Sequence, residues 1–146
     1  MQIPHDTFIL IADGKKSLFF RNQGDAEFPN LIVEREEGHP DREDSDIKSD
    51  GPGRAFSSVG TGRSAFEEPD FHQQAEDRFA EASAEILNER ALRKDYDALV
   101  VVAPPRTLGE LRKHFHKEVE RRLVAEVPKD LVNTPVAEIE SILQAQ

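Results

Sequence analysis

The run Leu99-Val-Val-Val102 constrains the fold more than any other stretch of this sequence. Four consecutive apolar residues predict a strand that is covered on both of its faces. Helical patterns lie on either side of this run, over residues 69–92 and from residue 107 onward. Strands that are joined by helices usually run parallel, through right-handed crossovers. The run therefore predicts an α/β fold in which residues 99–102 lie near the centre of the sheet.

Three apolar runs at the front of the chain predict an antiparallel meander. They cover residues 7–12, 17–22 and 31–33, and residues 34–37 are expected to be frayed or to lie at a sheet edge. Asp13-Gly14 is a turn signal between the first two runs, and the short connection favours a hairpin. Residues 22–25 give the turn before the third run.

The long helix is predicted over about residues 69–92, with proline suited to its first turn. Apolar residues at spacings of four, four, three and four indicate one face that packs on the sheet. The residues of this expected face are Phe71, Ala75, Phe79, Ala82 and Ile86.

The last third of the chain predicts two more helices and one more strand. Thr107-Leu-Gly-Glu110 matches a capping box, with Thr107 as N-cap of a helix. A second turn or helix around Val119 precedes a strand over residues 123–127, and Thr134-Pro135 opens a final helix.

These elements predict one α/β domain over residues 1–146, in the order β-β-β-α-β-α-β-α. An antiparallel hairpin followed by parallel strands gives a mixed five-stranded sheet with three main helices on its faces. This element order is found in ribonuclease-H-like folds. Residues 37–66 interrupt the order, because they combine glycine, proline and an acidic run with few apolar residues. We expect a mobile loop there, and fast amide exchange over residues 38–64.

The composition favours a globular protein and opposes non-specific binding to nucleic acid. The formal net charge is −10, no cysteine is present, and no apolar run approaches a membrane span. No disulfide framework or thiolate metal site is therefore expected. The first residues lack a signal-peptide pattern, so the expected location is the cytoplasm. The charge is uneven: residues 34–50 carry eight acids and three bases, and residues 106–122 carry six bases and three acids.

The segment Gly51–Phe66 is the first candidate binding site. It holds four glycines, two arginines and four hydroxyl side chains in sixteen residues. Glycine lets a backbone approach a ligand closely, and arginine offers a planar donor fork that fits phosphate. The segment is either a flexible surface loop or an anion-binding loop. The candidate residues are Arg54, Gly60, Gly62, Arg63 and Ser64.

Arg106 and Thr107 form the second candidate, since they follow the predicted central strand and open a helix. Ligands of open α/β sheets favour the carboxyl ends of strands, and helix N-termini favour anions. The alternative is simple helix capping beside a surface arginine.

Catalytic and metal-binding patterns are weak. Asp13 could supply one carboxylate of a metal-dependent nuclease, but Asp13-Gly14 is better explained as a turn, and no second and third acid are evident. His114 and His116 would point in different directions and lack a third ligand at a familiar spacing. We therefore predict no catalytic residue, no metal and no cofactor.

Four segments resemble the bacterial host-attachment protein family, whose members are described as required for attachment to host cells. They are Ile3–Gly14, Gly24–Leu31, Gly53–Ala65 and Val101–Lys113, and the resemblance covers nearly the whole chain. The resemblance also implies a relation to the middle domain of archaeal and eukaryotic peptide-chain release factors. That domain has a ribonuclease-H-like fold, and its Gly-Gly-Gln loop enters the ribosomal peptidyl-transferase centre.

The resemblance implies translation-related partners but not the release-factor reaction. Gly62-Arg63-Ser64-Ala65 is similar to the Gly-Gln-Ser-Ala context of that loop, with Arg63 where the glutamine would stand. The favoured hypothesis is a non-catalytic module that contacts ribosome, tRNA or other RNA through Arg54, Arg63 and the basic residues 106–122. The alternatives are a hydrolase, either a nuclease or a peptidyl-tRNA hydrolase, and a protein-interaction factor in host attachment. No membrane contact is expected, and the oligomeric state is left open.

Overall fold

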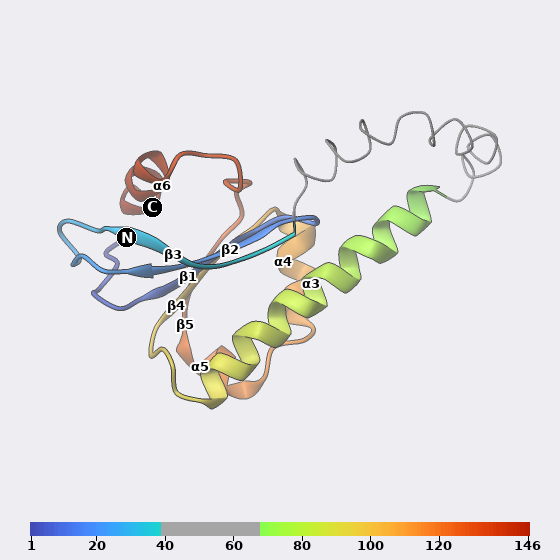
Figure 1. Cartoon of the computed structure of the whole chain (residues 1–146), viewed down its shortest axis with the longest axis horizontal. Coiled ribbons are helices and arrows are strands. Elements are labelled where there is room, and N and C mark those ends of the chain that lie inside the picture. The colour runs from blue at the N-terminus through green and yellow to red at the C-terminus, as the bar shows by residue number, and fades with distance from the viewer. Residues whose placement is uncertain (39–67) are drawn as a thin grey trace.

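Five strands form one mixed sheet in a computed structural model, which describes residues 1–38 and 68–146 (Figure 1). The strand order is β3-β2-β1-β4-β5, with β1–β2 and β2–β3 antiparallel and β1–β4 and β4–β5 parallel. This arrangement confirms the predicted α/β class, the N-terminal meander and the central place of residues 99–102. The strands are β1 (Phe8–Ala12), β2 (Ser17–Asn22), β3 (Leu31–Glu37), β4 (Leu99–Val102) and β5 (Leu123–Val127).

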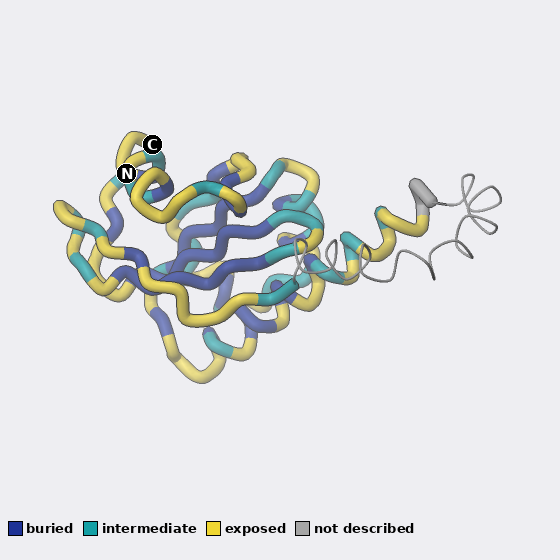
Figure 2. Tube along the Cα trace, turned by 45° about the horizontal axis from the view of Figure 1, so that its top comes forward, coloured by how far each residue is buried: buried dark blue, intermediate teal, exposed yellow. Residues whose placement is uncertain are grey.

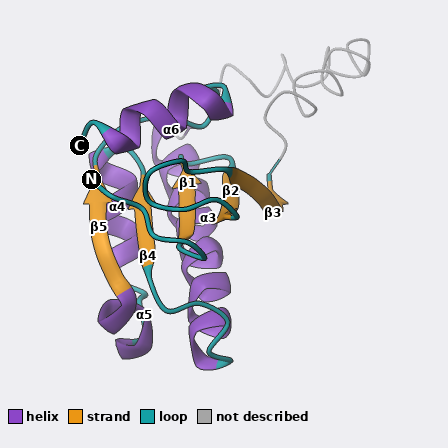
Figure 3. Ribbon diagram, turned by 90° about the vertical axis from the view of Figure 1, so that its left-hand side faces the viewer, coloured by secondary structure: helices purple, strands orange, loops and turns teal. Residues whose placement is uncertain are grey.

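The described helices cover both faces of the sheet. Helices α3, α4 and α5 lie on one face and α6 lies on the other (Figure 3). α5 has only six residues and matches the turn or helix expected around Val119, so the three main helices are confirmed. The helices are α3 (Glu68–Leu92), α4 (Pro105–Arg112), α5 (Lys117–Arg122) and α6 (Val136–Gln144).

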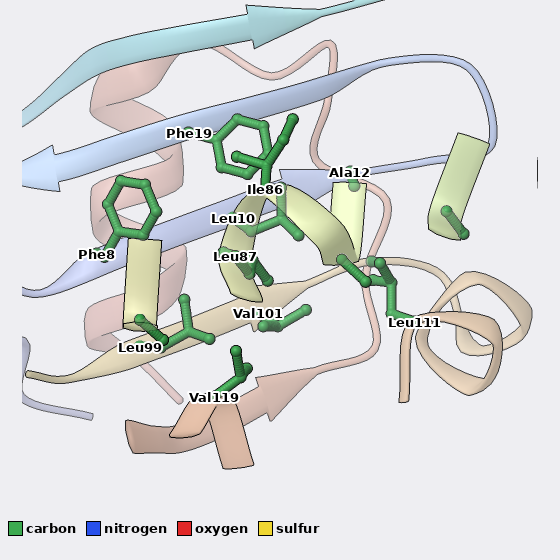
Figure 4. Packing of buried hydrophobic residues seen from close by; sticks show 14 of the residues in the cluster. Phe8, Leu10, Ala12, Phe19, Ile86, Leu87, Leu99, Val101, Leu111 and Val119 are labelled. Carbon is green, nitrogen blue, oxygen red and sulfur yellow. The ribbon is translucent and has the colours of Figure 1, made fainter. Parts of the chain in front are cut away.

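Alternate residues of the central strands build two separate cores. Phe8 and Leu10 of β1 pack toward α3, whereas Ile9 and Ile11 pack toward α6. Figure 4 shows the first of these cores, with Leu87 of α3 among the strand side chains. Because helices cover both faces, β1, β2 and β4 are buried along their whole length (Figure 2). This explains why β1 and β4 are continuous apolar runs, whereas β2 also buries the polar residues Ser17, Arg21 and Asn22.

The face of α3 that packs on the sheet differs from the predicted one. Phe71 is 61% exposed, and of the five predicted residues only Ile86 is buried. The first turns of the helix extend beyond the sheet (Figure 1), which fits the exposure of Phe71 and Ala75, whereas Phe79 is half-buried. Small side chains form the actual contact face and let the helix approach closely. The buried α3 residues are Ala80, Ser83, Ala84, Ile86, Leu87, Asn88 and Ala91.

The β1–β2 hairpin is closed by a turn that uses the Asp13 carboxylate. Asp13 Oδ1 accepts hydrogen bonds from the backbone N–H groups of Lys15 and Lys16 at 2.8 and 2.7 Å. The backbone N–H of Asp13 donates to the carbonyl of Lys16 at 2.9 Å. The turn interpretation of Asp13 is therefore confirmed, and this carboxylate is used by the fold.

The C-terminus of α3 ends in a Schellman motif with lysine at the left-handed position. The N–H of Asp95 donates to the carbonyl of Arg90, and the N–H of Lys94 donates to that of Ala91, both at 2.9 Å. Lys94 has a φ of 59°, a conformation that glycine adopts without strain.

Lys94→Gly is therefore expected to raise the free energy of unfolding by about 0.5–1 kcal/mol. The left-handed conformation costs a residue with a Cβ atom about 1–2 kcal/mol, and the greater freedom of glycine in the unfolded chain offsets part of this gain. Urea denaturation measures the change. Arg93→Gly is the control, because Arg93 is not in the left-handed region and should lose stability on the same substitution. A lower stability of Lys94→Gly would contradict the assignment.

Candidate functional site

Several chain segments meet at the carboxyl edge of the parallel strands. Ile11 pairs with Val102, so β1 and β4 end side by side. β3 also ends at this edge, because Glu37 lies opposite Ser17 in the antiparallel β2–β3 pair. Gly38, which directly follows β3, is the last described residue before the gap at residues 39–67. This edge is the usual ligand position in open α/β sheets.

The predicted site residues fall in two groups with respect to the structure. Arg106 and Thr107 lie in the first turn of α4 at this edge, with Arg106 exposed and Thr107 half-buried. Arg54, Gly60, Gly62, Arg63 and Ser64 lie outside the described residues, as do nearly all of the predicted mobile loop and its expected fast exchange. The structure therefore positions Arg106 and Thr107 alone, and β3 continues through Glu37, where that loop was expected to begin.

The predicted capping box at the start of α4 is wrong. Pro104 is the N-cap, α4 begins at Pro105, and no side chain caps this end. Proline fixes φ in the helical range and suits the first position, so the helix starts earlier than Thr107. Glu110 instead contacts Lys113 at 3.0 Å and His114 at 3.6 Å. Since the first turn also has no acidic residue, its partial positive charge is not offset by a carboxylate of α4.

The basic segment 106–122 is largely neutralised by the protein itself. Four of its six bases lie within 3.3 Å of a carboxylate oxygen, and the Arg112–Glu126 pair is bidentate. Among the described residues, Arg106 and Lys117 have no acidic side chain within ion-pair distance. Within this segment, Arg106 is the base that stays without such a partner at the sheet edge, where the exposed Lys15 of the β1–β2 turn also lies. The four pairs are Arg112–Glu126, Lys113–Glu110, Arg121–Glu118 and Arg122–Glu118.

Glu118 forms ion pairs with both Arg121 and Arg122. The hydrogen bond from Arg122 is the main cause that lowers the pKa of Glu118 below its ordinary value, with the charge of Arg121 adding to it. Arg122 also donates to the carbonyl of Tyr96 at 2.8 Å. Both side chains thus hold α5 to the chain before β4 and are not free for a ligand.

The two histidines of this region have structural roles. His116 is the N-cap of α5, where its Nδ1 accepts a hydrogen bond from the N–H of Glu118 at 3.0 Å. The Asn88 side chain of α3 bonds the carbonyl of His114 and the N–H of His116, both at 2.8 Å. Within residues 1–38 and 68–146, no three His, Cys, Asp or Glu side chains are grouped to hold a metal ion.

The outer side of α3 is acidic. Glu81, Glu85 and Glu89 follow one another at four-residue spacing along this side of the helix, with the exposed Arg78 and Arg93 beside them. The three glutamates are exposed. This side of α3 would repel phosphate groups, so a polyanion is expected to approach the sheet edge rather than this helix surface.

A polar cluster that the sequence did not predict lies on the α3 side of the sheet. It consists of Arg21, Glu34, Arg90 and Asp95 and is called the Arg21 cluster below. Arg21 is 8% exposed and donates to Glu34, Asp95 and the carbonyl of Asp6. Burial lowers the pKa of Arg21, but the hydrogen bonds and charges of Glu34 and Asp95 outweigh it and raise that pKa overall.

The Arg21 cluster borders a cleft of about 410 Å³, but its charges are already paired. The cleft is lined by the turn before β1 and the loop before β4, including Thr7, Arg21 and Tyr96. The guanidinium groups of Arg21 and Arg90 each lie 4.8 Å from the centre of the Phe8 ring, a cation–π distance. All of these contacts tie the fold together and leave no group of Arg21 to a ligand.

Residues 6–143 match the model of Bacterial archaeo-eukaryotic release factor family 12. The chain belongs to this family. The predicted relation to release factors is therefore confirmed at the level of family, and host attachment stays a prediction. A comparison with curated proteins found no match. In the described part of this family 12 chain, no helix is long and apolar enough to cross a membrane.

Proposed function

We propose that this release-factor-like chain is a non-catalytic module that binds structured RNA, as part of the ribosome or as tRNA. The observation that carries the proposal is the family match, which spans nearly the whole chain. Translation supplies the partners that a release-factor family implies. The proposed contact residues are those of the carboxyl edge, Arg106 and Thr107, together with Arg54, Gly60, Gly62, Arg63 and Ser64.

The charges of the described residues support this edge over other surfaces. Arg106 is exposed, has no acidic partner among these residues, and stands on a helix start without an acidic cap. The remaining bases of segment 106–122 are mostly ion-paired, and the outer side of α3 is acidic. With a net charge of −10, binding should be modest and strongly dependent on salt.

Hydrolysis is the weaker alternative. Arg63 stands where the release-factor reaction requires glutamine, and the Asp13 carboxylate is used by the β1–β2 turn. A role in host attachment is the third alternative, and it would follow from altered translation if the RNA-binding proposal is correct. Among residues 1–38 and 68–146, neither alternative has a specific side-chain arrangement in its favour.

Arg106→Ala is expected to weaken RNA binding about tenfold, the effect of losing one charge-assisted hydrogen bond to phosphate. The slope of log K against log salt is negative, and its magnitude should fall by about 0.9 for each duplex phosphate contact removed. Fluorescence anisotropy with labelled tRNA across a salt series measures both quantities. The combined Arg54/Arg63/Arg106 alanine variant should lose more.

Arg121→Ala is the matched control, since Arg121 is exposed in the same segment but pairs with Glu118. Its binding should stay close to that of the wild type, and the melting temperature of each variant checks folding. Unchanged tRNA binding by the folded triple variant would reject the proposed edge. Absence of binding by the wild-type chain to both tRNA and ribosomes would reject the function.

A further inference from the structure

β3 is an edge strand that few side chains anchor. Residues 32–36 are exposed, and Leu31 is the one residue of β3 that is buried. The beginning of the strand is held by Leu31, whose N–H also donates to Glu140 of α6 at 2.8 Å. Beyond that residue, the strand depends on its hydrogen bonds to β2 and on a few ion pairs.

Glu34 lies at a β-bulge of β3, where it can act as such an anchor. Phe19 pairs with Arg35 and Phe20 pairs with Val33, so the bulge leaves Glu34 without a partner residue on β2. Ile32 lies opposite Arg21, so Glu34, two residues further on, is on the face of the sheet on which Arg21 and α3 lie.

Glu34 connects β3 to two other elements at once. Its Oε2 lies 3.2 Å from Arg21 Nε, and its Oε1 lies 3.3 Å from Arg21 Nη2. The same Oε1 lies 3.4 Å from Nη1 of Arg90, near the end of α3. Asp95 holds both arginines in place from the other side, at 3.1 Å from each.

We propose that Glu34 is a latch, and that β3 opens from β2 as a unit separate from the rest of the sheet when this latch is broken. The strand buries too little apolar surface beyond Leu31 to stay closed as firmly as β1 or β4. The contacts of Glu34 with Arg21 and Arg90 set the balance between its closed and open states. Gly38 is the last described residue before the gap, and α3 begins directly after it. The latch therefore holds Gly38 in a fixed position relative to α3.

Hydrogen exchange followed by mass spectrometry tests the latch without any ligand, so the result does not depend on the proposed function. Glu34→Gln keeps the size of the side chain but removes its charge and turns one acceptor toward the arginines into a donor. Exchange of peptides covering β3 is expected to become about tenfold faster, the effect of losing one charge-assisted hydrogen bond from the closed state. Exchange in β1 and β4 should stay as in the wild type.

Glu36→Gln is the matched control on the same strand, because Glu36 makes only a 3.7 Å contact with Lys16 and is about half exposed. Its β3 exchange should change little. Unchanged β3 exchange in Glu34→Gln would overturn the latch. Equal acceleration in β1, β3 and β4 would also overturn it, since β3 would then open only with the whole domain. Equal effects of the two variants would show that Glu34 has no special role.

Discussion

Arg21→Met is expected to lower the free energy of unfolding by about 2–4 kcal/mol, because the buried guanidinium donates to two partly exposed carboxylates and to two carbonyls that would lose this donor. Arg21 is 8% exposed and joins four parts of the chain, namely β2, β3, the turn before β1 and the loop before β4. Without it, Glu34 and Asp95 share Arg90 alone, and the carbonyls of Asp6 and Asp95 lose a donor. Methionine fills most of the volume, so the loss reports polar contacts rather than a cavity.

Urea denaturation of the wild type and Arg21→Met measures this loss. Arg35→Met is the matched control, since Arg35 lies on β3, is nearly half exposed and pairs with Glu37 on its own strand. Exposed pairs of this kind contribute about 0–1 kcal/mol, so this variant should unfold near the wild-type midpoint. An Arg21→Met protein as stable as Arg35→Met would show that the Arg21 cluster does not hold the fold together.

Leu87→Ala is the second substitution with a large expected effect, a loss of about 2–5 kcal/mol. Leu87 is fully buried between α3 and the sheet, in the core that includes Leu10 and Val101 (Figure 4). Truncation removes apolar contacts and leaves a cavity that the neighbouring strands cannot close. Ala84 and Ala91, one helical turn away on the same face, are too short to fill this space.

Phe71→Ala on the same helix is the matched control for the stability loss of Leu87→Ala. Phe71 is 61% exposed on the part of α3 that extends beyond the sheet, so its removal should change stability by about 0.5 kcal/mol or less. Thermal or urea unfolding of both variants decides between the two helix faces. A larger loss for Phe71→Ala than for Leu87→Ala would favour the face predicted from the sequence.

The strands of this fold were predictable because each carries its own signal. Continuous apolar runs mark strands that helices cover on both faces, and the turn at Asp13-Gly14 fixes the first hairpin. The contact face of α3 was not predictable from periodicity. Its alanines pack on the sheet but give a weak apolar signal, whereas Phe71 and Phe79 give a strong one although Phe71 is exposed and Phe79 is only half-buried.

The candidate site was predictable only where it follows from the strand order. Arg106 lies at the carboxyl edge because it comes directly after a central strand, which the sequence already indicates. The capping box at Thr107 failed because Pro104 and Pro105 start the helix earlier. The pairing of the basic segment and the Arg21 cluster depend on contacts between distant residues. The β-bulge at Glu34 likewise leaves no local pattern that identifies it.

Co-sedimentation with ribosomes tests the central claim of a translation-related binding module most directly. Purified wild-type protein is expected to pellet with ribosomes at low salt and to return to the supernatant as salt rises. The folded Arg54/Arg63/Arg106 alanine variant should pellet less at every salt concentration, and Arg121→Ala should follow the wild type. A wild-type protein that stays in the supernatant at all salt concentrations, and that also fails to bind tRNA, would contradict the account.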